Sequence, residues 1–445
     1  MAERFDLIVK GGRAMTPSGL VEADIAIADG KIAAIGRIDL PADTVLDAKG
    51  LHVLPGVIDS QVHFREPGLT HKEDLATGTA GAALGGVTAI FEMPNTNPNT
   101  ATAEALAEKL SLAEGRVWCD VAFFVGATTE NAETLGELER LPGAAGIKIF
   151  MGSSTGTLLV ADDETLLRAL GNGTRRVAIH SEDEYRLRER HALVKDGADP
   201  VMHPVWRDVE TATRATQRVM RLARQAKRRV HILHVTTAEE VPILAANKDL
   251  VTMEVTPQHL TLAAPDCYRE LGTFAQMNPP IREMRHREAL WQAVRDGIVD
   301  VIGSDHAPHT KDEKAKPYPQ SPSGMPGVQT LLPLMLDHMN AGRLTLERLV
   351  DLTSAGPARI YNVASKGRIA VGYDGDLSIV DLKAKRTIES KQQATRCGWT
   401  PFDGRSVTGW PKATVVRGHI VMREDELIGR PIGRPVRFAE CLGSM

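Results

Sequence analysis

Eight short runs rich in apolar and β-branched residues recur through the middle of the chain, and most are followed by a helical pattern. The intervening stretches, such as REALWQAVRDG, place apolar residues at i, i+3 and i+4. Because parallel strands need crossover connections, this alternation predicts an α/β fold, a (β/α)8 TIM-like barrel. An open doubly wound sheet is the alternative, but the count of eight favours the barrel. The runs are VLPGVIDSQVHF, VTAIFEMPN, CDVAFFVGAT, GIKIFMG, RVAIHSE, RVHILHVT, LVTMEVTPQHL and VDVIGSDH.

Both ends of the chain follow a different pattern. Residues 5–50 alternate apolar and polar side chains, with Asp29-Gly30 at a tight-turn position, which is typical of a β-hairpin. Similar short strands return at 375–382 and 413–422. We therefore expect one small β-domain made from both termini beside the central domain. Two unrelated terminal extensions are the alternative.

Composition argues against several classes of partner. A net charge of −4 and a pI of about 6.4 leave no basic surface for nucleic acid. The four cysteines are scattered with no CxxC pair, which predicts reduced thiols in a cytoplasmic protein. The N-terminal residues do not resemble a signal peptide, and no run of about 18 apolar residues would span a membrane.

Polar residues stand at the ends of the predicted strands, where the active sites of such barrels lie. Gln61, His63 and Arg65 have the same parity, so they would point to one face of a strand. A single histidine there is usually a hydrogen-bonded core residue, and an aspartate after Gly-Ser can cap a helix. Three histidines and a carboxylate from four strands nevertheless indicate zinc. These residues are His63, His180, His234 and Asp305, with Asn95, Lys148, Asn278 and His309 at comparable positions.

Lys148 is unusual because it lies inside the apolar run GIKIFM. An ammonium group among histidine ligands would repel a divalent cation and would be costly to bury. Carbon dioxide can convert a lysine to a carbamate, whose two anionic oxygens can bridge two metals. We therefore expect Lys148 to be a carbamylated ligand. A structural lysine paired with Asp305 is the alternative.

These motifs resemble those of the cyclic amidohydrolases, and most closely those of the dihydroorotases. The similarity runs from GVIDSQVHFREPG through EMPNTNP, GIKIF, the two histidine strands, MNPPIR and SDHAPHTKDEK to TPFDG. The resemblance implies a metal-dependent barrel beside a composite β-sandwich formed by both termini. We expect the sandwich to comprise residues 1–55 and 366–445, and the barrel to comprise 56–365. It also implies a homodimer.

The resemblance also implies a role for individual residues of this chain that match the motifs of the family. It implies that one or two zinc ions are held by His63, Lys148 as a carbamate, His180, His234 and Asp305. Asp305 would also be the catalytic acid and base, moving a proton from a zinc-activated water to the leaving ring nitrogen. The substrate would be held by Arg65, Asn95, Asn278 and His309, with the backbone near Gly324 closing over it.

The expected reaction is the reversible cyclisation of N-carbamoyl-L-aspartate to dihydroorotate in pyrimidine synthesis. Dihydroorotate carries a carboxylate that an arginine such as Arg65 can hold bidentately. An allantoinase or hydantoinase-like enzyme is one alternative, and an inactive subunit that scaffolds aspartate transcarbamoylase is another. Three departures from the family pattern stand out: Gln61 replaces the first histidine of HxH, the segment after Lys148 resembles the lysine-bridged members, and Ser323 replaces a commoner phenylalanine.

Overall fold

The computed structural model describes residues 4–154 and 158–439. Its centre is an eight-stranded parallel sheet whose strands pair in chain order. A bridge between Val62 and His306 brings the segment after the last strand beside the first, and the His63 N–H donates to the His306 carbonyl at 2.7 Å. The predicted barrel is therefore confirmed. Its strands are β6 (Val57–Val62), β7 (Val87–Glu92), β8 (Asp120–Gly126), β9 (Ala144–Phe150), β10 (Val177–His180), β11 (Val230–Ile232), β12 (Val251–Val255) and β13 (Val301–Ile302).

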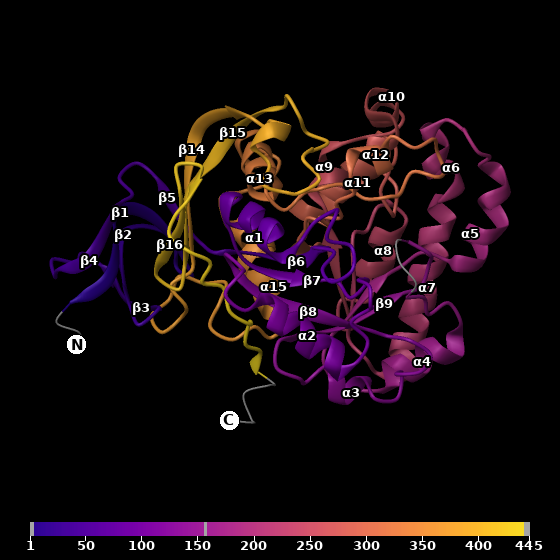
Figure 1. Cartoon of the computed structure of the whole chain (residues 1–445), viewed down its shortest axis with the longest axis horizontal. Coiled ribbons are helices and arrows are strands. Elements are labelled where there is room, and N and C mark those ends of the chain that lie inside the picture. The colour runs from indigo at the N-terminus through magenta and orange to yellow at the C-terminus, as the bar shows by residue number, and fades with distance from the viewer. Residues whose placement is uncertain (1–3, 155–157, 440–445) are drawn as a thin grey trace.

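Every residue of these eight strands is buried, as expected where helices cover the outside of a barrel and side chains fill its inside. Several helices begin at a side-chain cap; Asp74, Asp162 and Asp208 each accept a hydrogen bond from a backbone N–H three residues on. Figure 1 shows the helices surrounding the barrel. The α-helices are α1 (Leu75–Leu84), α2 (Ala103–Ala113), α3 (Leu135–Leu138), α4 (Asp163–Gly171), α5 (Glu184–Arg190), α6 (His203–Trp206), α7 (Val209–Ala226), α8 (Glu240–Ala245), α9 (Pro257–Thr261), α10 (Asp266–Leu271), α11 (Met284–Arg295), α12 (Lys311–Lys314), α13 (Leu331–Asn340), α14 (Leu346–Val350) and α15 (Gly356–Ile360).

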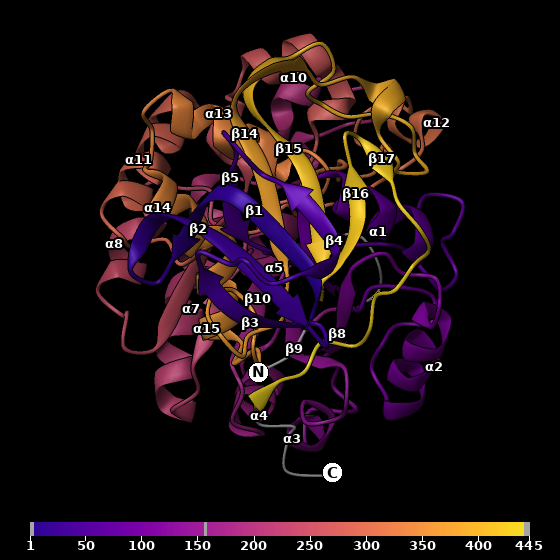
Figure 2. The same cartoon turned by 90° about the vertical axis from the view of Figure 1, so that its left-hand side faces the viewer.

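The two ends of the chain together form a nine-stranded mixed sheet, which confirms the composite terminal domain. The connection is made by β5 and β14, which pair antiparallel from Pro55–Leu377 to His52–Val380. Figures 1 and 2 show the N-terminal strands as an outer layer over the C-terminal strands, which face the barrel. The strands are β1 (Phe5–Thr16), β2 (Gly19–Ala28), β3 (Lys31–Gly36), β4 (Ala42–Asp47), β5 (His52–Pro55), β14 (Leu377–Thr387), β15 (Ser406–Val416), β16 (His419–Arg423) and β17 (Glu426–Leu427).

Local sequence explains the tight turn between β2 and β3. Asp29 and Gly30 both have positive φ, 51° and 72°, as a two-residue hairpin turn of this hand requires. Buried apolar residues from both layers, such as Ile27 and Ile379, fill the space between them.

After β17 the chain leaves this sheet and returns to the barrel. Pro435 pairs with Val121 at the start of β8, and Phe438 pairs with Val363. Phe438 packs against Phe91 with ring centroids 5.7 Å apart, in a buried cluster below the strands. The far end of the barrel is therefore covered by the last described residues of the chain.

No helix in the described part of the chain is long and apolar enough to cross a membrane. The cysteines at 119, 267 and 397 are buried free thiols, and Cys441 lies outside the described residues.

Candidate metal centre and active site

The five predicted metal ligands line one cavity at the carboxyl ends of the barrel strands, together with Gln61, Asn278, Ser323 and Gly324. The cavity is about 20 Å³, which accommodates little more than one water-sized occupant. A neighbouring pocket of about 600 Å³ shares Ser154, Asn278 and Ser323 with it and opens outward. A ring substrate would therefore reach the small cavity through the larger pocket. The five residues are His63, Lys148, His180, His234 and Asp305.

His63 and Asp305 form the first donor pair. The His63 Nδ1 lies 2.7 Å from Asn95 Oδ1, so that ring nitrogen carries the proton and Nε2 presents its lone pair. This Nε2 lies 3.3 Å from Asp305 Oδ1. Two ligand atoms on one tetrahedral zinc, each about 2.0–2.1 Å from it, are about 3.3 Å apart. The pair is therefore spaced to bind one ion.

His180 and His234 form a second pair. The His180 Nε2 lies 2.9 Å from Glu182 Oε2 and donates to it, which leaves Nδ1 free to coordinate. That Nδ1 lies 3.1 Å from His234 Nε2, again close to the separation of about 3.3 Å for two ligands of one zinc. Burial lowers the pKa of both imidazoles, so both are neutral at pH 7 as metal binding requires.

Lys148 lies on β9 next to β10, the strand that ends at His180, and its side chain is buried in the same cavity. Its Nζ lies 4.4 Å from the centre of the Phe150 ring. Among the described residues no carboxylate lies within ion-pair distance of this ammonium, so the alternative of a lysine paired with Asp305 finds no support. Burial lowers the pKa of Lys148 to about 7, which makes the neutral amine that reacts with carbon dioxide accessible at neutral pH.

Gln61 takes part in the same cavity. Its Nε2 donates to Asp305 Oδ1 at 3.2 Å, while its buried Oε1 has no hydrogen-bond partner in the described structure. A buried amide oxygen without a partner is costly, and a metal ion or its water would satisfy it. Nitrogen, carboxylate and amide oxygen donors therefore fit a divalent ion here.

Arg65 and His309 lie beside the cavity. Arg65 is only 2% exposed, and among the described residues it makes no ion pair with a carboxylate. Its Nε donates to the Pro308 carbonyl at 3.2 Å, and its Nη2 lies 3.3 Å from His309 Nε2. The Lys72 ammonium approaches the other ring nitrogen of His309 at 3.1 Å. Glu313 pairs with Lys72 at 3.1 Å, so Arg65 is the cation here that has no carboxylate partner among the described residues.

The remaining predicted residues lie around this region. Asn95 forms a hydrogen bond with His63 and therefore orients that candidate ligand. Asn278 lines both pockets. Gly324 has φ +138°, and a Cβ there would lie 2.4 Å from the Ala307 carbonyl oxygen, so only glycine allows this loop to approach so closely. The N–H of Gly324 donates to the Gln276 carbonyl at 2.9 Å.

A buried ion pair supports the second donor pair, and no motif in the sequence indicates it. Glu182 accepts from Arg207, and both side chains are almost fully buried. Burial alone would raise the pKa of Glu182, but the charge of Arg207 and the contacts with His180 together outweigh it and hold that pKa well below its usual range. The carboxylate therefore stays charged, fixes the His180 tautomer and raises the basicity of its free nitrogen.

Backbone strain also marks this region. Arg65, His234 and Asp305 adopt the left-handed conformation, with φ of 65°, 35° and 44°. Such conformations cost free energy in residues with a Cβ and are concentrated at functional sites.

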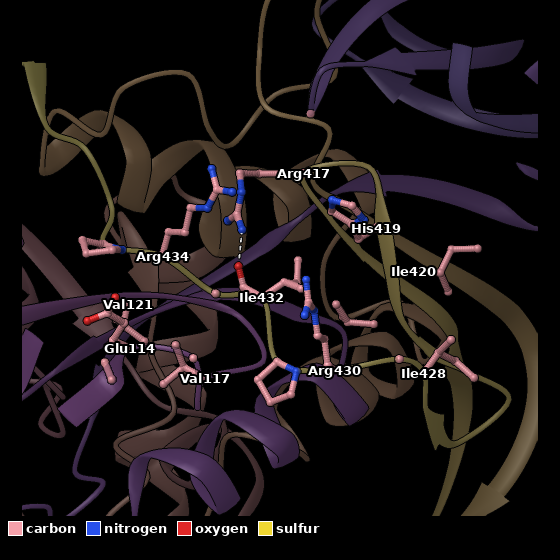
Figure 3. Close-up of a pocket in the computed structure, with 18 of the residues that line it drawn as sticks. Glu114, Val117, Val121, Arg417, His419, Ile420, Ile428, Arg430, Ile432 and Arg434 are labelled. Carbon is pink, nitrogen blue, oxygen red and sulfur yellow. Dashed lines mark hydrogen bonds between the residues drawn. The ribbon is translucent and has the colours of Figure 1, made fainter. Parts of the chain in front are cut away.

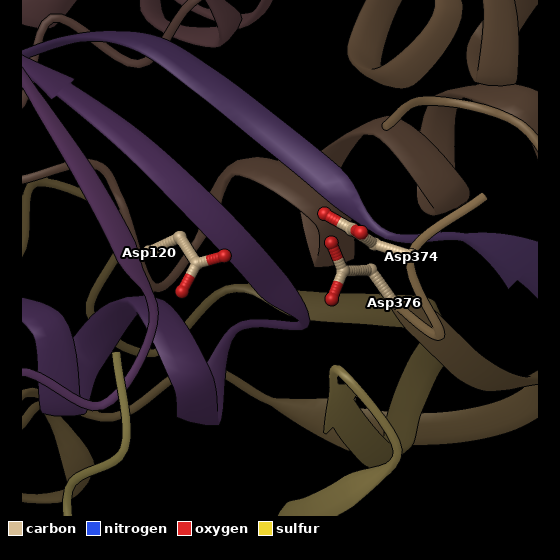
Figure 4. A group of neighbouring side chains, drawn as sticks. All are labelled: Asp120, Asp374 and Asp376. Carbon is tan, nitrogen blue, oxygen red and sulfur yellow. The ribbon is translucent and has the colours of Figure 1, made fainter. Parts of the chain in front are cut away.

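A second cavity and a cluster of carboxylates lie elsewhere in the molecule, and neither has the features of a catalytic centre. A cavity of about 1300 Å³ between the terminal sheet and α2 is lined by Arg417, Arg430 and Arg434, but it opens near the start of β8, away from the catalytic end (Figure 3). Three carboxylates, Asp120, Asp374 and Asp376, gather near the same end (Figure 4). The Lys366 ammonium contacts all three, at 2.7 Å from Asp120. Arg417 also pairs with Asp120 and Lys31 with Asp374, so cations of the chain itself already balance these carboxylates.

Comparison with known proteins agrees with this arrangement. The amidohydrolase family model matches residues 52–421. A dihydroorotase of Methanosarcina mazei is 36% identical over 99% of this chain and 99% of that protein. A dihydroorotase of Halobacterium salinarum is 38% identical over 93% of this chain and 99% of its own length. Among solved structures, an L-hydantoinase (dihydropyrimidinase) from Arthrobacter aurescens has a TM-score of 0.91 at 32% identity, covering 97% of this chain and 99% of that one.

These matches extend over nearly the whole chain and include both the barrel and the terminal sheet. Amidohydrolases are generally metal-dependent, in keeping with the donor atoms in the cavity. On this evidence the chain belongs to the amidohydrolase family and is a cyclic amide hydrolase.

Proposed function

We propose that the protein is a dihydroorotase, which interconverts N-carbamoyl-L-aspartate and dihydroorotate in pyrimidine synthesis. The observation that supports this choice over other ring amides is the Arg65 guanidinium, which is buried beside the cavity without a carboxylate partner among the described residues. An unpaired buried charge is costly, so a site keeps one where a ligand supplies the opposite charge. Dihydroorotate has one carboxylate, and hydantoin and dihydropyrimidine rings have none.

The neighbours of Arg65 strengthen this inference. Lys72 can only donate hydrogen bonds, so it requires an unprotonated Nδ1 on His309 and leaves the proton on Nε2. Burial, followed by the charges of Arg65 and Lys72, holds the pKa of His309 well below its usual value, so the ring stays neutral. The His309 Nε2–H donates to the Ser323 carbonyl at 3.0 Å, which holds this loop beside Arg65. The Arg65 guanidinium would then supply the main donors to the substrate carboxylate, with His309 beside it.

Each remaining residue has a proposed task near the ring. Zinc, when bound by the residues named above, would polarise the ring carbonyl and supply a nucleophilic water of lowered pKa. The carboxylate of Asp305 would accept a proton in the hydrolytic direction and return it to the leaving ring nitrogen. Asn278 would orient the ring. In the biosynthetic direction the clamped carboxylate would fold a flexible chain toward the closing geometry.

A substrate panel tests this proposal. The zinc-loaded protein should turn over dihydroorotate with a higher kcat/KM than dihydrouracil, hydantoin or allantoin. Arg65→Met should lower kcat/KM for dihydroorotate at least about 30-fold, because losing one partner of a buried charge pair costs about 2–5 kcal/mol. Activity on an uncharged ring should change little. Equal losses on both kinds of ring would disprove the carboxylate clamp.

A matched control separates this effect from the loss of any buried arginine. Arg175 is also buried and donates to the Ala144 and Ala145 carbonyls at the start of β9, away from the cavity. Arg175→Met should weaken folding without changing the preference between charged and uncharged rings.

A hydantoinase-like activity is the second candidate, because the L-hydantoinase from Arthrobacter aurescens has the same fold at a TM-score of 0.91. The panel distinguishes the two, since a hydantoinase would prefer the uncharged rings. An inactive scaffolding subunit predicts neither bound zinc nor turnover. A homodimer and a cytoplasmic location complete the proposal and are open to sedimentation and cell fractionation.

A further inference from the structure

His203 is a fully buried histidine next to the active site that the proposed mechanism does not use. It begins α6, and its Nε2 lies 2.9 Å from the Met277 carbonyl oxygen and 3.0 Å from Asn278 Oδ1. Its Nδ1 lies 3.2 Å from the Tyr318 hydroxyl. All the polar atoms of the ring therefore have partners, and one partner is a residue that lines the catalytic cavity.

These contacts determine where the protons lie. A backbone carbonyl only accepts hydrogen bonds, so the Nε2 facing Met277 must carry a proton. Burial lowers the pKa of His203 to about 3, so the ring is neutral and its Nδ1 is an acceptor. The Tyr318 hydroxyl then donates to Nδ1. The proton arrangement follows from the partners and does not depend on observing hydrogens.

The same logic fixes the Asn278 side chain. Its Oδ1 can accept a hydrogen bond from the His203 Nε2–H. In the flipped amide the Asn278 NH2 group would face that N–H, and two donors cannot form a hydrogen bond. The Asn278 Nδ2 is therefore turned the other way, where Ser154 Oγ lies at 3.4 Å. Asn278 and Ser154 both line the cavity and the outer pocket. The amide nitrogen of Asn278, with one N–H directed at Ser154, is thus the side of the amide that faces the space through which a substrate would pass.

We propose that His203, held by Tyr318, is a positioning residue that keeps the Asn278 amide turned with its N–H groups toward the substrate. The group that Asn278 recognises is then a hydrogen-bond acceptor, a ring carbonyl oxygen, and not a ring N–H. This inference rests on the proposed function for the identity of the ring. The proton arrangement itself rests on His203, Tyr318, Met277 and Asn278 alone.

Two matched substitutions test the direction of the hydrogen bond. His203→Gln keeps a donor near the position of Nε2, whereas His203→Glu places an anionic acceptor there that favours the flipped amide. In the zinc-loaded protein His203→Gln should keep KM for dihydroorotate within about twofold of the wild type. His203→Glu and His203→Phe should raise the KM for dihydroorotate about tenfold, because the substrate loses about one hydrogen bond when the amide turns. The change in kcat should be much smaller.

Two further measurements guard against simple unfolding. Tyr318→Phe leaves the imidazole in place but removes the donor to Nδ1, so it should raise KM less than His203→Phe does. His338→Phe alters a partly buried histidine, bonded to Thr261 at 2.8 Å, and should leave KM unchanged. Zinc retention should match the wild type in all these variants.

Nitrogen-15 NMR of the zinc-loaded protein gives a readout that does not need turnover. The His203 signals, identified by their loss in His203→Gln, should show a proton on Nε2. A proton on Nδ1, or an unchanged KM in both His203→Glu and His203→Phe, would overturn the inference. If the wild type hydrolyses only uncharged rings, the proposed function fails, and the same KM comparison on such a ring then supports or overturns this inference.

Discussion

Replacing Glu182 by glutamine should weaken metal binding and folding together. Glu182 accepts from both Arg207 and His180, and all three side chains are almost fully buried. Glu182→Gln removes the negative charge that fixes the His180 proton and leaves the Arg207 guanidinium buried without an anion. Losing one partner of a buried ion pair costs about 3–5 kcal/mol, and losing the group that orients a metal-binding histidine costs about 10–100-fold in metal affinity.

The stability loss should depend on pH with a defined sign. Because Arg207 holds the pKa of Glu182 below the unfolded value of about 4.3, the carboxylate stabilises the fold at every pH above that value. This contribution is lost progressively as the pH falls further. The unfolding free energies of the wild type and Glu182→Gln should therefore differ most above about pH 5 and converge in acid.

A second buried pair provides the control. Glu139 and Arg228 are also almost fully buried and ion-paired, but they lie before β9 and β11, at the opposite end of the barrel. Urea unfolding of the metal-free proteins should show similar losses for Glu139→Gln and Glu182→Gln. Competition with a zinc-binding dye should show weaker affinity only in Glu182→Gln. Equal zinc affinities in the two variants would refute the role assigned to Glu182.

Three further changes have distinct expected outcomes. Lys148→Ala should lose most bound zinc, measured by elemental analysis, and most turnover, and bicarbonate should restore neither; full activity would exclude the carbamate. Gln61→His adds an imidazole beside Asp305, so more zinc should remain per chain after dialysis against a weak chelator. Lys366→Met leaves the buried Asp376 without a cation and removes one of two from Asp120 and Asp374, so it should cost about 3–5 kcal/mol in urea unfolding, while KM stays unchanged.

The strands could be predicted because each has a local pattern. The eight runs became β6 to β13. Gln61 at the end of β6 and His63 just after it both line the cavity, as their parity predicted, whereas Arg65 lies beyond the strand in a left-handed conformation and does not line it. One run, VLPGVIDSQVHF, divides at Gly56: its first half is β5 of the terminal sheet and its second half is β6 of the barrel. Nothing in an apolar run shows where it passes from one sheet to another.

The groups that orient the candidate ligands could not be predicted in this way. Glu182 and Arg207 form an ion pair although they are 25 positions apart in the sequence, and His203 contacts Asn278, 75 positions away. Neither pair has a spacing that a helix or strand would impose, so only tertiary packing brings them together. The positive φ of His234 and Asp305 is equally invisible in the sequence, because neither residue is glycine.

The composite terminal sheet has a consequence for how this protein is synthesised. Val57, two residues after the end of β5, donates its N–H to the Ser378 hydroxyl on β14, 321 positions later. At about 5–20 residues per second, roughly 15–60 s separate the two ends of this contact on the ribosome. Throughout that interval one edge of β5 has no strand to pair with, and unpaired edges attract other chains. We therefore expect nascent chains to aggregate chiefly through their first sixty or so residues, and chaperones that bind early in translation to matter most.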